Sequence, residues 1–344
     1  MNRYEVTIGI PVYRAVDYIE ATMQSALSQT YADIEFLIVD DCGGDGSMAV
    51  VELLKREHPR GGDIRILRNS KNLGVGKSRN RLLDEAQGRY LYFLDSDDTI
   101  EPDTIELLYD AMKENGAEVV YGSYEKIDNV KFRPKQTFQY PFLCLLHKDE
   151  LAGYAFSHYG SFQCSVCNCL FRLDFLQQMN LRFLDAMFWE DMAFTYDMVT
   201  QVSRAVLLPQ ITYHYVCRPH SLSNYQDRTV LQRDEILNNA STIDYLKLKC
   251  YSLRDKSYAA DFCYSLQMNS FYIVCHVLKH RQRISPPILN RELRQIMRHP
   301  MPFRNLMNLN RKWLQNMTIW LVARLPTPLF MPIVVTMGKI KKVL

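Results

Sequence analysis

Short strand-like and helix-like segments alternate over the first 128 residues, and this alternation limits the possible folds more than any other feature of the sequence. Strands, rich in β-branched or continuous apolar residues, are predicted at 4–12, 34–39, 64–67, 90–94 and 118–124. Helices are predicted between them at 16–28, 47–57, 78–86 and from about 102 to 115, where Gly116 follows the last turn. Strands separated by helices of this length form βαβ units. The sequence therefore predicts an α/β fold with a mainly parallel sheet flanked by helices.

Polar side chains follow the predicted strands at their carboxyl ends. Asp40 and Asp41 come after the second strand, and the acidic loop Asp95-Ser96-Asp97-Asp98 comes after the fourth. Ligands of open α/β sheets bind at the carboxyl ends of the strands, so these groups are expected to share one edge. A carboxylate beside a buried strand is costly unless it is hydrogen-bonded or binds a cation. The pattern indicates a ligand or metal site at this edge.

The acidic loop has an alternative role as the N-cap of the helix predicted near Pro102, because aspartate is a favoured capping residue. A cap requires one aspartate, and this loop holds three within four residues. We therefore favour metal binding over capping.

The 344 residues correspond to roughly two domains at about 150 residues each.

The charge of the chain is unevenly distributed. Residues 281–344 hold twelve Lys and Arg side chains and a single acidic one, Glu292, whereas residues 1–280 carry a net charge of −8. A basic tail on an acidic body is typical of proteins that bind a polyanion, either nucleic acid or an anionic membrane surface. The composition, 47% hydrophobic and 23% charged, excludes a disordered chain.

The cysteines are expected to be reduced thiols. No apolar signal-peptide core follows Met1, so a cytoplasmic location is expected. Cys164, Cys167 and Cys169 form a C-x2-C-x-C cluster, but a structural zinc site needs a fourth ligand, and no further Cys pair or His-x3-His follows at the usual spacing. We interpret these three as buried apolar residues.

Five motifs occur in a fixed order between residues 4 and 225. They are Ile10-Pro11-Val12-Tyr13, the Asp-Asp-containing segment 39–47, Asn72-Leu73-Gly74 with Ser78-Arg79-Asn80, the segment 93–98, and Trp189-Glu190-Asp191. Each motif alone is weak, but their order and spacing together are specific. The set resembles the family 2 inverting glycosyltransferases, sugar-nucleotide-dependent bacterial enzymes with the Rossmann-like GT-A fold. Tyr215, Arg218, Ser221 and Ser223 are similar to the closing loop of this family.

The resemblance implies a metal site in the acidic loop. Asp97 would bind Mg²⁺ or Mn²⁺, and Asp95 would contact the metal or the ribose. Asp98 would support these two residues from the second shell of the metal. Ser96 would line the site that binds the sugar nucleotide. An oxygen-ligated divalent cation suits this chemistry because it neutralises the leaving diphosphate.

The resemblance also implies a nucleotide site. Asp40 would accept a hydrogen bond from the uracil N3–H, Pro11 and Tyr13 would line the base pocket, and Arg79 would reach the base or the phosphates. The alternatives are a core aromatic role for Tyr13 and a solvated helix position for Arg79.

Inversion by a single in-line displacement needs one general base opposite the leaving group. Asp191 matches the family's base, and Glu190 would orient or contact the acceptor. The alternative is that both acids only stabilise the N-terminus of a helix predicted at 192–201.

The sequence departs from the family pattern at Cys167 and Cys169, where relatives usually carry Trp and Lys. This departure leaves open how the site neutralises phosphate or shapes its acceptor pocket. His214 and His220 flank the closing loop, and some relatives complete the metal shell with a histidine from this region. A lone histidine is more often simply hydrogen-bonded, and we favour that role here.

We interpret the chain as a metal-dependent hexosyl- or hexosaminyltransferase of polysaccharide biosynthesis, which moves a sugar from a UDP-sugar to a glycan or lipid-linked acceptor. The catalytic domain is predicted at 1–225 and a helical, basic C-terminal region at 226–344. One alternative is a nucleotidyltransferase, which would carry a glycine-rich basic loop where Pro11-Val12-Tyr13 stands. Another is a nucleic-acid-binding protein that uses the basic tail, but no known nucleic-acid motif accompanies its arginines.

The tail contains a long apolar stretch that does not predict a membrane span. Residues 325–338 are apolar for only fourteen positions and include three prolines, whereas a spanning helix needs about twenty apolar residues. Positive charge and aromatic side chains instead suit a segment that lies on an anionic leaflet, and the residues concerned are Arg311, Lys312, Trp313, Trp320, Arg324, Lys339, Lys341 and Lys342. The alternative is a basic helical cap on the catalytic domain. We expect peripheral binding at the cytoplasmic membrane face.

Overall fold

The computed structural model describes residues 3–128, 134–158, 162–186, 189–217, 228–299, 301–309 and 311–344, without the side chain of Pro134. They form two compact units. The first comprises residues 1–151, 163–185 and 194–219, and the second comprises 152–162, 186–193 and 220–344. Each unit is described by itself. The domain boundary predicted at residue 225 stays a prediction.

The first unit is built on one sheet. Its strands within the described residues are β1 (Tyr4–Val12), β2 (Ile34–Asp40), β3 (Ile64–Arg68), β4 (Gly88–Phe93), β5 (Thr99–Ile100), β6 (Val119–Asp128), β7 (Pro134–Phe138), β8 (Leu143–Leu145), β9 (Cys169–Arg172) and β10 (Ala205–Cys217). The order is β3-β2-β1-β4-β9-β6-β10-β5, with β7 beside β6 and β8 beside β10.

The sheet has a parallel half and a mixed half. The strands β3, β2, β1 and β4 are all parallel. Beyond them, β9 runs antiparallel to both β4 and β6, while β10 is parallel to β6. The predicted α/β class is confirmed, and the antiparallel β9 makes the second half mixed.

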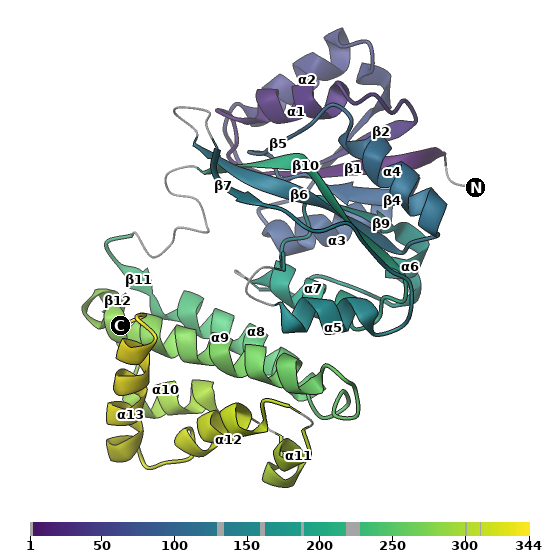
Figure 1. Ribbon diagram of the computed structural model, residues 1–344. Helices are drawn as coiled ribbons and strands as arrows, with labels where there is room; N and C mark the ends of the chain where they lie inside the picture. The colour runs from purple at the N-terminus through teal and green to yellow at the C-terminus, as the bar shows by residue number, and fades with distance from the viewer. Residues whose placement is uncertain are drawn as a thin grey trace. The chain divides into compact units, whose positions relative to one another are not determined.

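Helices cover both faces of the sheet (Figure 1). The helices α1 (Ile19–Leu27) and α2 (Ser47–Glu57) lie on one face, and α3 (Val75–Glu85) and α6 (Leu173–Gln178) lie on the other. The remaining helices of the polypeptide up to residue 199 are α4 (Thr104–Asn115), α5 (Glu150–Ser157) and α7 (Glu190–Val199). Because both faces are covered, nearly every residue of β1 and β2 is buried, which explains their continuous apolar sequence.

Two helices begin earlier than the hydrophobic pattern predicts. Helix α3 begins at Val75 rather than at residue 78, directly after Gly74, whose φ of 88° lies in the left-handed region. Helix α7 begins at Glu190 rather than at residue 192, so both acids of its motif lie in the first turn. Polar first turns lack an apolar periodicity, so the pattern places both boundaries too late.

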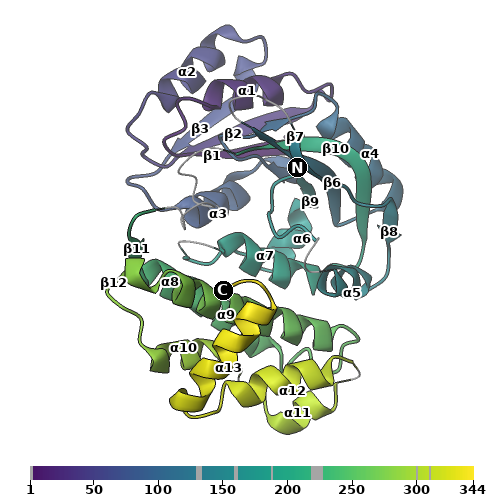
Figure 2. The same ribbon diagram turned by 60° about the vertical axis from the view of Figure 1, so that its left-hand side comes forward.

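The second unit is helical. It contains α8 (Arg233–Lys249), α9 (Ala259–Lys279), α10 (Asn290–Met297), α11 (Phe303–Met307), α12 (Trp313–Val322), α13 (Thr327–Ile340) and a short pair of strands, β11 (Leu231–Gln232) and β12 (Ile284–Ser285). Helix α9 lies between α8 on one side and α10, α12 and α13 on the other (Figure 2). Among the described residues, none of the helices combines the length and apolar character needed to cross a membrane.

Candidate functional site

The parallel half of the sheet brings two groups of predicted site residues to one edge. Asp40 ends β2 and pairs in register with Val12 at the end of β1. On the other side of β1, the N–H of Leu94 donates to the carbonyl of Gly9, and the acidic loop begins at the next residue. Asp40 and Asp95 therefore follow the two strands that flank β1, as the sequence predicts.

A pocket of about 280 Å³ opens beside Asp40. Its lining residues come from the ends of β1 and β2 and from the start of α2, and they are Val12, Arg14, Asp40, Cys42, Gly43, Gly44, Asp45, Ser47 and Met48. Asp40 Oδ1 accepts a hydrogen bond from the Cys42 N–H at 3.0 Å. The side chain of Asp40 is 17% exposed, so its carboxylate remains accessible to a ligand.

Asp40 is the one lining residue among the predicted site residues, and Arg14 and Cys42 are two of those that were not predicted. Both have a left-handed backbone, with φ of 50° and 57°, which is uncommon for residues other than glycine. Strained backbone of this kind concentrates at ligand sites. Their only signal in the sequence is position, since Arg14 follows the motif that ends at Tyr13 and Cys42 lies within the motif of residues 39–47.

Pro11 and Tyr13 occupy different environments. Pro11 is buried within β1, where it pairs with Val39. Tyr13 is 39% exposed, so the core alternative does not apply, and the Arg14 guanidinium lies over its ring at 5.3 Å. Their roles toward a base stay predictions.

Asp41 organises the loops at this edge. It is 3% exposed, and its Oδ1 accepts hydrogen bonds from Asn69 Nδ2 at 2.7 Å and from the Leu73 N–H at 2.9 Å. Its Oδ2 accepts from the Gly74 N–H at 2.9 Å. Asp41 therefore fixes the segment that leads into α3, while its neighbour Asp40 faces the pocket.

We expect Asp41→Asn to lower the free energy of unfolding by about 1–3 kcal/mol, because the amide leaves a buried donor without its acceptor. Urea denaturation measures this change. The matched control is Asp40→Asn, which disturbs one exposed hydrogen bond and a 3.9 Å ion pair with the exposed Arg68 and should cost about 1 kcal/mol or less. Equal losses in the two variants would contradict this division of roles.

The acidic loop is held on both sides. Arg79, which is 2% exposed on α3, donates to Asp95 Oδ1 at 2.7 Å, so Arg79 is not a solvated helix residue. Asp98 is buried and accepts from the Tyr213 hydroxyl at 2.5 Å and from the Val216 N–H at 2.8 Å. Burial raises the pKa of Asp98 well above its usual range, and the charges of Asp97 and Asp95 raise it further. The loop is thus anchored to α3 and to β10, and its carboxylates repel one another.

The chemistry of the loop fits an oxygen-ligated divalent cation. The capping alternative fails, because α4 begins at Thr104 with Asp103 as its N-cap residue. Asp95 and Asp97 are both partly exposed, and the repulsion felt at Asp98 is of the kind that a cation relieves. Carboxylate oxygens are the ligands that Mg²⁺ and Mn²⁺ prefer.

His214 is engaged elsewhere. Its Nε2 lies 2.7 Å from Glu101 Oε1, and its Nδ1 lies 3.0 Å from Glu125 Oε1. Both ring nitrogens therefore face carboxylates, which supports the hydrogen-bonded interpretation. His220 and the closing-loop residues Arg218, Ser221 and Ser223 lie outside the described residues.

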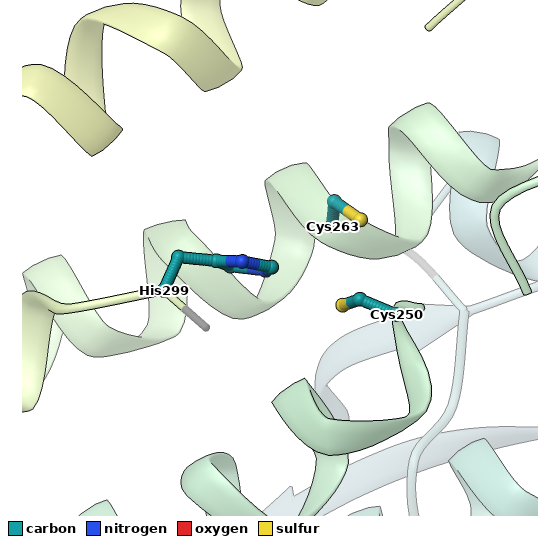
Figure 3. Close-up of side chains that lie close together, drawn as sticks. All are labelled: Cys250, Cys263 and His299. Carbon is teal, nitrogen blue, oxygen red and sulfur yellow. The ribbon is translucent and has the colours of Figure 1, made fainter. Parts of the chain in front are cut away.

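The predicted thiol cluster and a second thiol group are both buried. Cys167 and Cys169 lie in the core beside β4 and β6, and Cys164 is partly buried. Within the described part of the chain, the one set of three ligands close enough to share an ion is Cys250, Cys263 and His299, in the second unit (Figure 3).

The ring of His299 does not suit a metal in this arrangement. Its Nδ1 accepts the Met301 N–H at 3.1 Å, which leaves the proton of the neutral ring on Nε2. Burial lowers the pKa of His299 to about 3 and raises the pKa of the Cys250 thiol. Three candidate ligands meet here among the described residues, whereas a structural zinc site needs four. We therefore assign this group to the core of the second unit.

Glu190 and Asp191 belong to the second unit, in the first turn of α7. Glu190 is 7% exposed and Asp191 is partly exposed. Trp189 precedes them with a φ of 62°, a strained value for a bulky residue. The first-turn position also suits the helix dipole, so both interpretations of these acids remain compatible with the structure.

Comparisons with known proteins identify the family. The family described as "Glycosyl transferase family 2" matches residues 7–179. The cholesterol galactosyltransferase of Borreliella burgdorferi is 25% identical over 80% of this chain and 77% of its own length. The β-1,3-glucosyltransferase WfgD of Escherichia coli is 36% identical, over 38% of this chain and 49% of its own length.

Solved structures confirm the GT-A fold. The crystal structure of Staphylococcus aureus TarS 1–349 in complex with UDP-GlcNAc superposes with a TM-score of 0.64 at 17% identity, covering 95% of this chain and 90% of that chain. The sheet, with acidic residues after its parallel strands, places the chain among the α/β enzymes of this fold. The chain belongs to glycosyltransferase family 2 and is a glycosyltransferase.

Proposed function

We propose that the enzyme transfers a hexose or hexosamine from a UDP-sugar to an acceptor by a single, inverting displacement. The observation that carries this proposal is the position of the Asp40 pocket and the acidic loop at the ends of the strands that flank β1. A nucleotide that lies across the end of β1 has its base near Asp40 and its diphosphate near Asp95 and Asp97. Family membership argues against the nucleotidyltransferase and nucleic-acid-binding alternatives.

Asp97 and Asp95 would hold Mg²⁺ or Mn²⁺. When bound, such a cation neutralises the charge that develops on the leaving diphosphate. Arg79 keeps Asp95 in place through its 2.7 Å contact, and Asp98 ties the loop to β10. With these two carboxylates as ligands, oxygens of the diphosphate and of water would complete the coordination.

Asp191 would act as the general base that takes the proton of the acceptor hydroxyl. Glu190, the more buried of the two acids, would orient the acceptor or the base. No covalent sugar–enzyme intermediate is needed, because a single in-line displacement inverts the anomeric carbon.

The acceptor would be a lipid-linked or membrane-proximal glycan at the cytoplasmic membrane face, as part of polysaccharide biosynthesis. The names of the two relatives support this proposal. One acts on cholesterol, and the other, named UDP-Glc:alpha-D-GlcNAc-diphosphoundecaprenol beta-1,3-glucosyltransferase, acts on a lipid-linked sugar.

A panel of UDP-, GDP- and ADP-sugars, assayed for hydrolysis with and without EDTA, tests the donor. We expect turnover of a UDP-sugar that EDTA abolishes. Asp40→Ala should weaken UDP binding, measured by calorimetry, more than it disturbs folding, measured by thermal unfolding. Equal binding of UDP, GDP and ADP to the wild type would refute uracil recognition while leaving the family assignment intact.

A further inference from the structure

Two helices of the second unit turn an apolar face outward. In α12 the buried positions are Asn316, Ile319 and Val322, and in α13 they are Phe330, Val334 and Gly338. The opposite sides are apolar as well. Their exposed side chains, which we call the outward apolar face, are Trp313, Leu314, Leu321, Leu329, Ile333 and Ile340.

The orientation of α12 is fixed by a buried polar contact. Asn316, which is fully buried, accepts from Gln267 Nε2 on α9 at 2.6 Å and donates to the carbonyl of Ala260 at 3.1 Å. Rotating α12 to bury its leucines would break both bonds and leave buried polar atoms without partners. The exposure of Leu314 and Leu321 is therefore built into the fold.

A close approach fixes α13 in the same way. A Cβ at Gly338 would lie 3.2 Å from Cys275 Sγ on α9 and closer still to Leu344. A side chain here would require Cys275 to shift by a few tenths of an ångström, so glycine suits the close approach. With Gly338 packed against α9, Leu329 and Ile333 are 57% and 37% exposed.

The structure divides the basic residues predicted to lie on a membrane into two sets. Arg311 and Lys312 pair with Asp261, which is buried at the start of α9, and Lys312 lies 2.7 Å from it. Arg324 stacks over Trp320 at 3.4 Å, and Trp320 donates to the carbonyl of Met301. These contacts lie within the second unit, so the inference below rests on the remaining basic residues of the predicted set.

The other set is exposed at the end of α13. Lys339, Lys341 and Lys342 are exposed and form no ion pair within the described part of the chain. Glu292, the single acid of residues 281–344, is paired with Arg233. The positive charge beside the outward apolar face is therefore not neutralised by the tail itself.

We infer that the outward apolar face and these three lysines bind the surface of an anionic lipid bilayer. Exposed apolar side chains enter the boundary between headgroups and acyl chains, while lysines contact anionic headgroups. The inference rests on the proposed function in one respect. Membrane binding would bring the enzyme to its lipid-linked acceptor.

Vesicle sedimentation of the full-length protein tests the charge. At low salt, the protein should sediment with vesicles of equal parts phosphatidylglycerol and phosphatidylcholine but not with phosphatidylcholine alone. Lys339→Glu/Lys341→Glu should weaken this binding by about tenfold or more. The control is Lys55→Glu/Arg56→Glu, which makes the same change of charge in the last turn of α2 and should bind like the wild type.

A second pair of variants tests the apolar face. Leu329→Ser/Ile333→Ser should reduce binding to anionic vesicles, whereas Leu53→Ser/Leu248→Ser, at exposed leucines of α2 and α8, should not. Wild-type protein that stays in the supernatant, or a dimer that only Leu329→Ser/Ile333→Ser dissociates, would overturn the inference. Vesicle binding needs no donor and hydrolysis of UDP-sugars needs no vesicle, so the two proposals fail separately.

Discussion

Asp97→Ala is expected to abolish EDTA-sensitive sugar transfer. The variant removes a carboxylate that would hold the divalent cation, and the leaving diphosphate then departs without its counter-charge. Metal assistance supplies several kcal/mol to such a step, so we expect a loss of about a thousandfold or more. Steady-state turnover with Mg²⁺ or Mn²⁺ measures the loss.

Calorimetry separates this role from a general loss of structure. Wild-type protein should bind UDP more tightly when Mn²⁺ is present, and Asp97→Ala should bind it equally with and without the metal. Asp103→Ala is the control, since Asp103 is exposed in the same segment and makes no capping hydrogen bond. If Asp97→Ala retained activity near the wild-type level, the assignment of the metal to this loop would be refuted.

The second large effect is expected at Asp191. Asp191→Asn keeps the shape of the side chain and removes the base, so transfer should fall by about two to four decades. Donor affinity should persist, because the residue would act on the acceptor hydroxyl. Single-turnover kinetics and calorimetry with the UDP-sugar measure the two quantities.

The competing role of Asp191 is stabilisation of the first turn of α7, and it predicts a different result. Loss of a first-turn acid costs about 0.3–1 kcal/mol of stability and leaves the chemistry unchanged. Asp234→Asn, at an exposed acid in the first turn of α8, calibrates that cost on the same chain. If Asp191→Asn only lowers the unfolding temperature as Asp234→Asn does, or loses the donor together with activity, Asp191 is not the base.

The buried strands and the polar residues at their ends could be predicted from the sequence alone. Continuous apolar runs such as those of β1 and β2 are local signals, and the parallel arrangement follows from the helices between them. Once the strands are parallel, Asp40 and the acidic loop must reach the same edge. The antiparallel β9 carries no comparable signal, because its four residues pair with β4 and β6 through contacts distant in sequence.

The tertiary structure decided which of several chemically similar residues are free to act. Asp40 and Asp41 are adjacent acids. The Asp41 carboxylate accepts hydrogen bonds from residues 69–74, whereas Asp40 faces the pocket. In the tail, Arg311 and Lys312 form ion pairs with Asp261, whereas the lysines at the end of α13 are exposed. Composition and spacing determine which charges a segment carries. Partners that lie some 30 to 50 residues away determine whether each charge is buried in a pair or available to a ligand, because only packing brings those partners within hydrogen-bond distance.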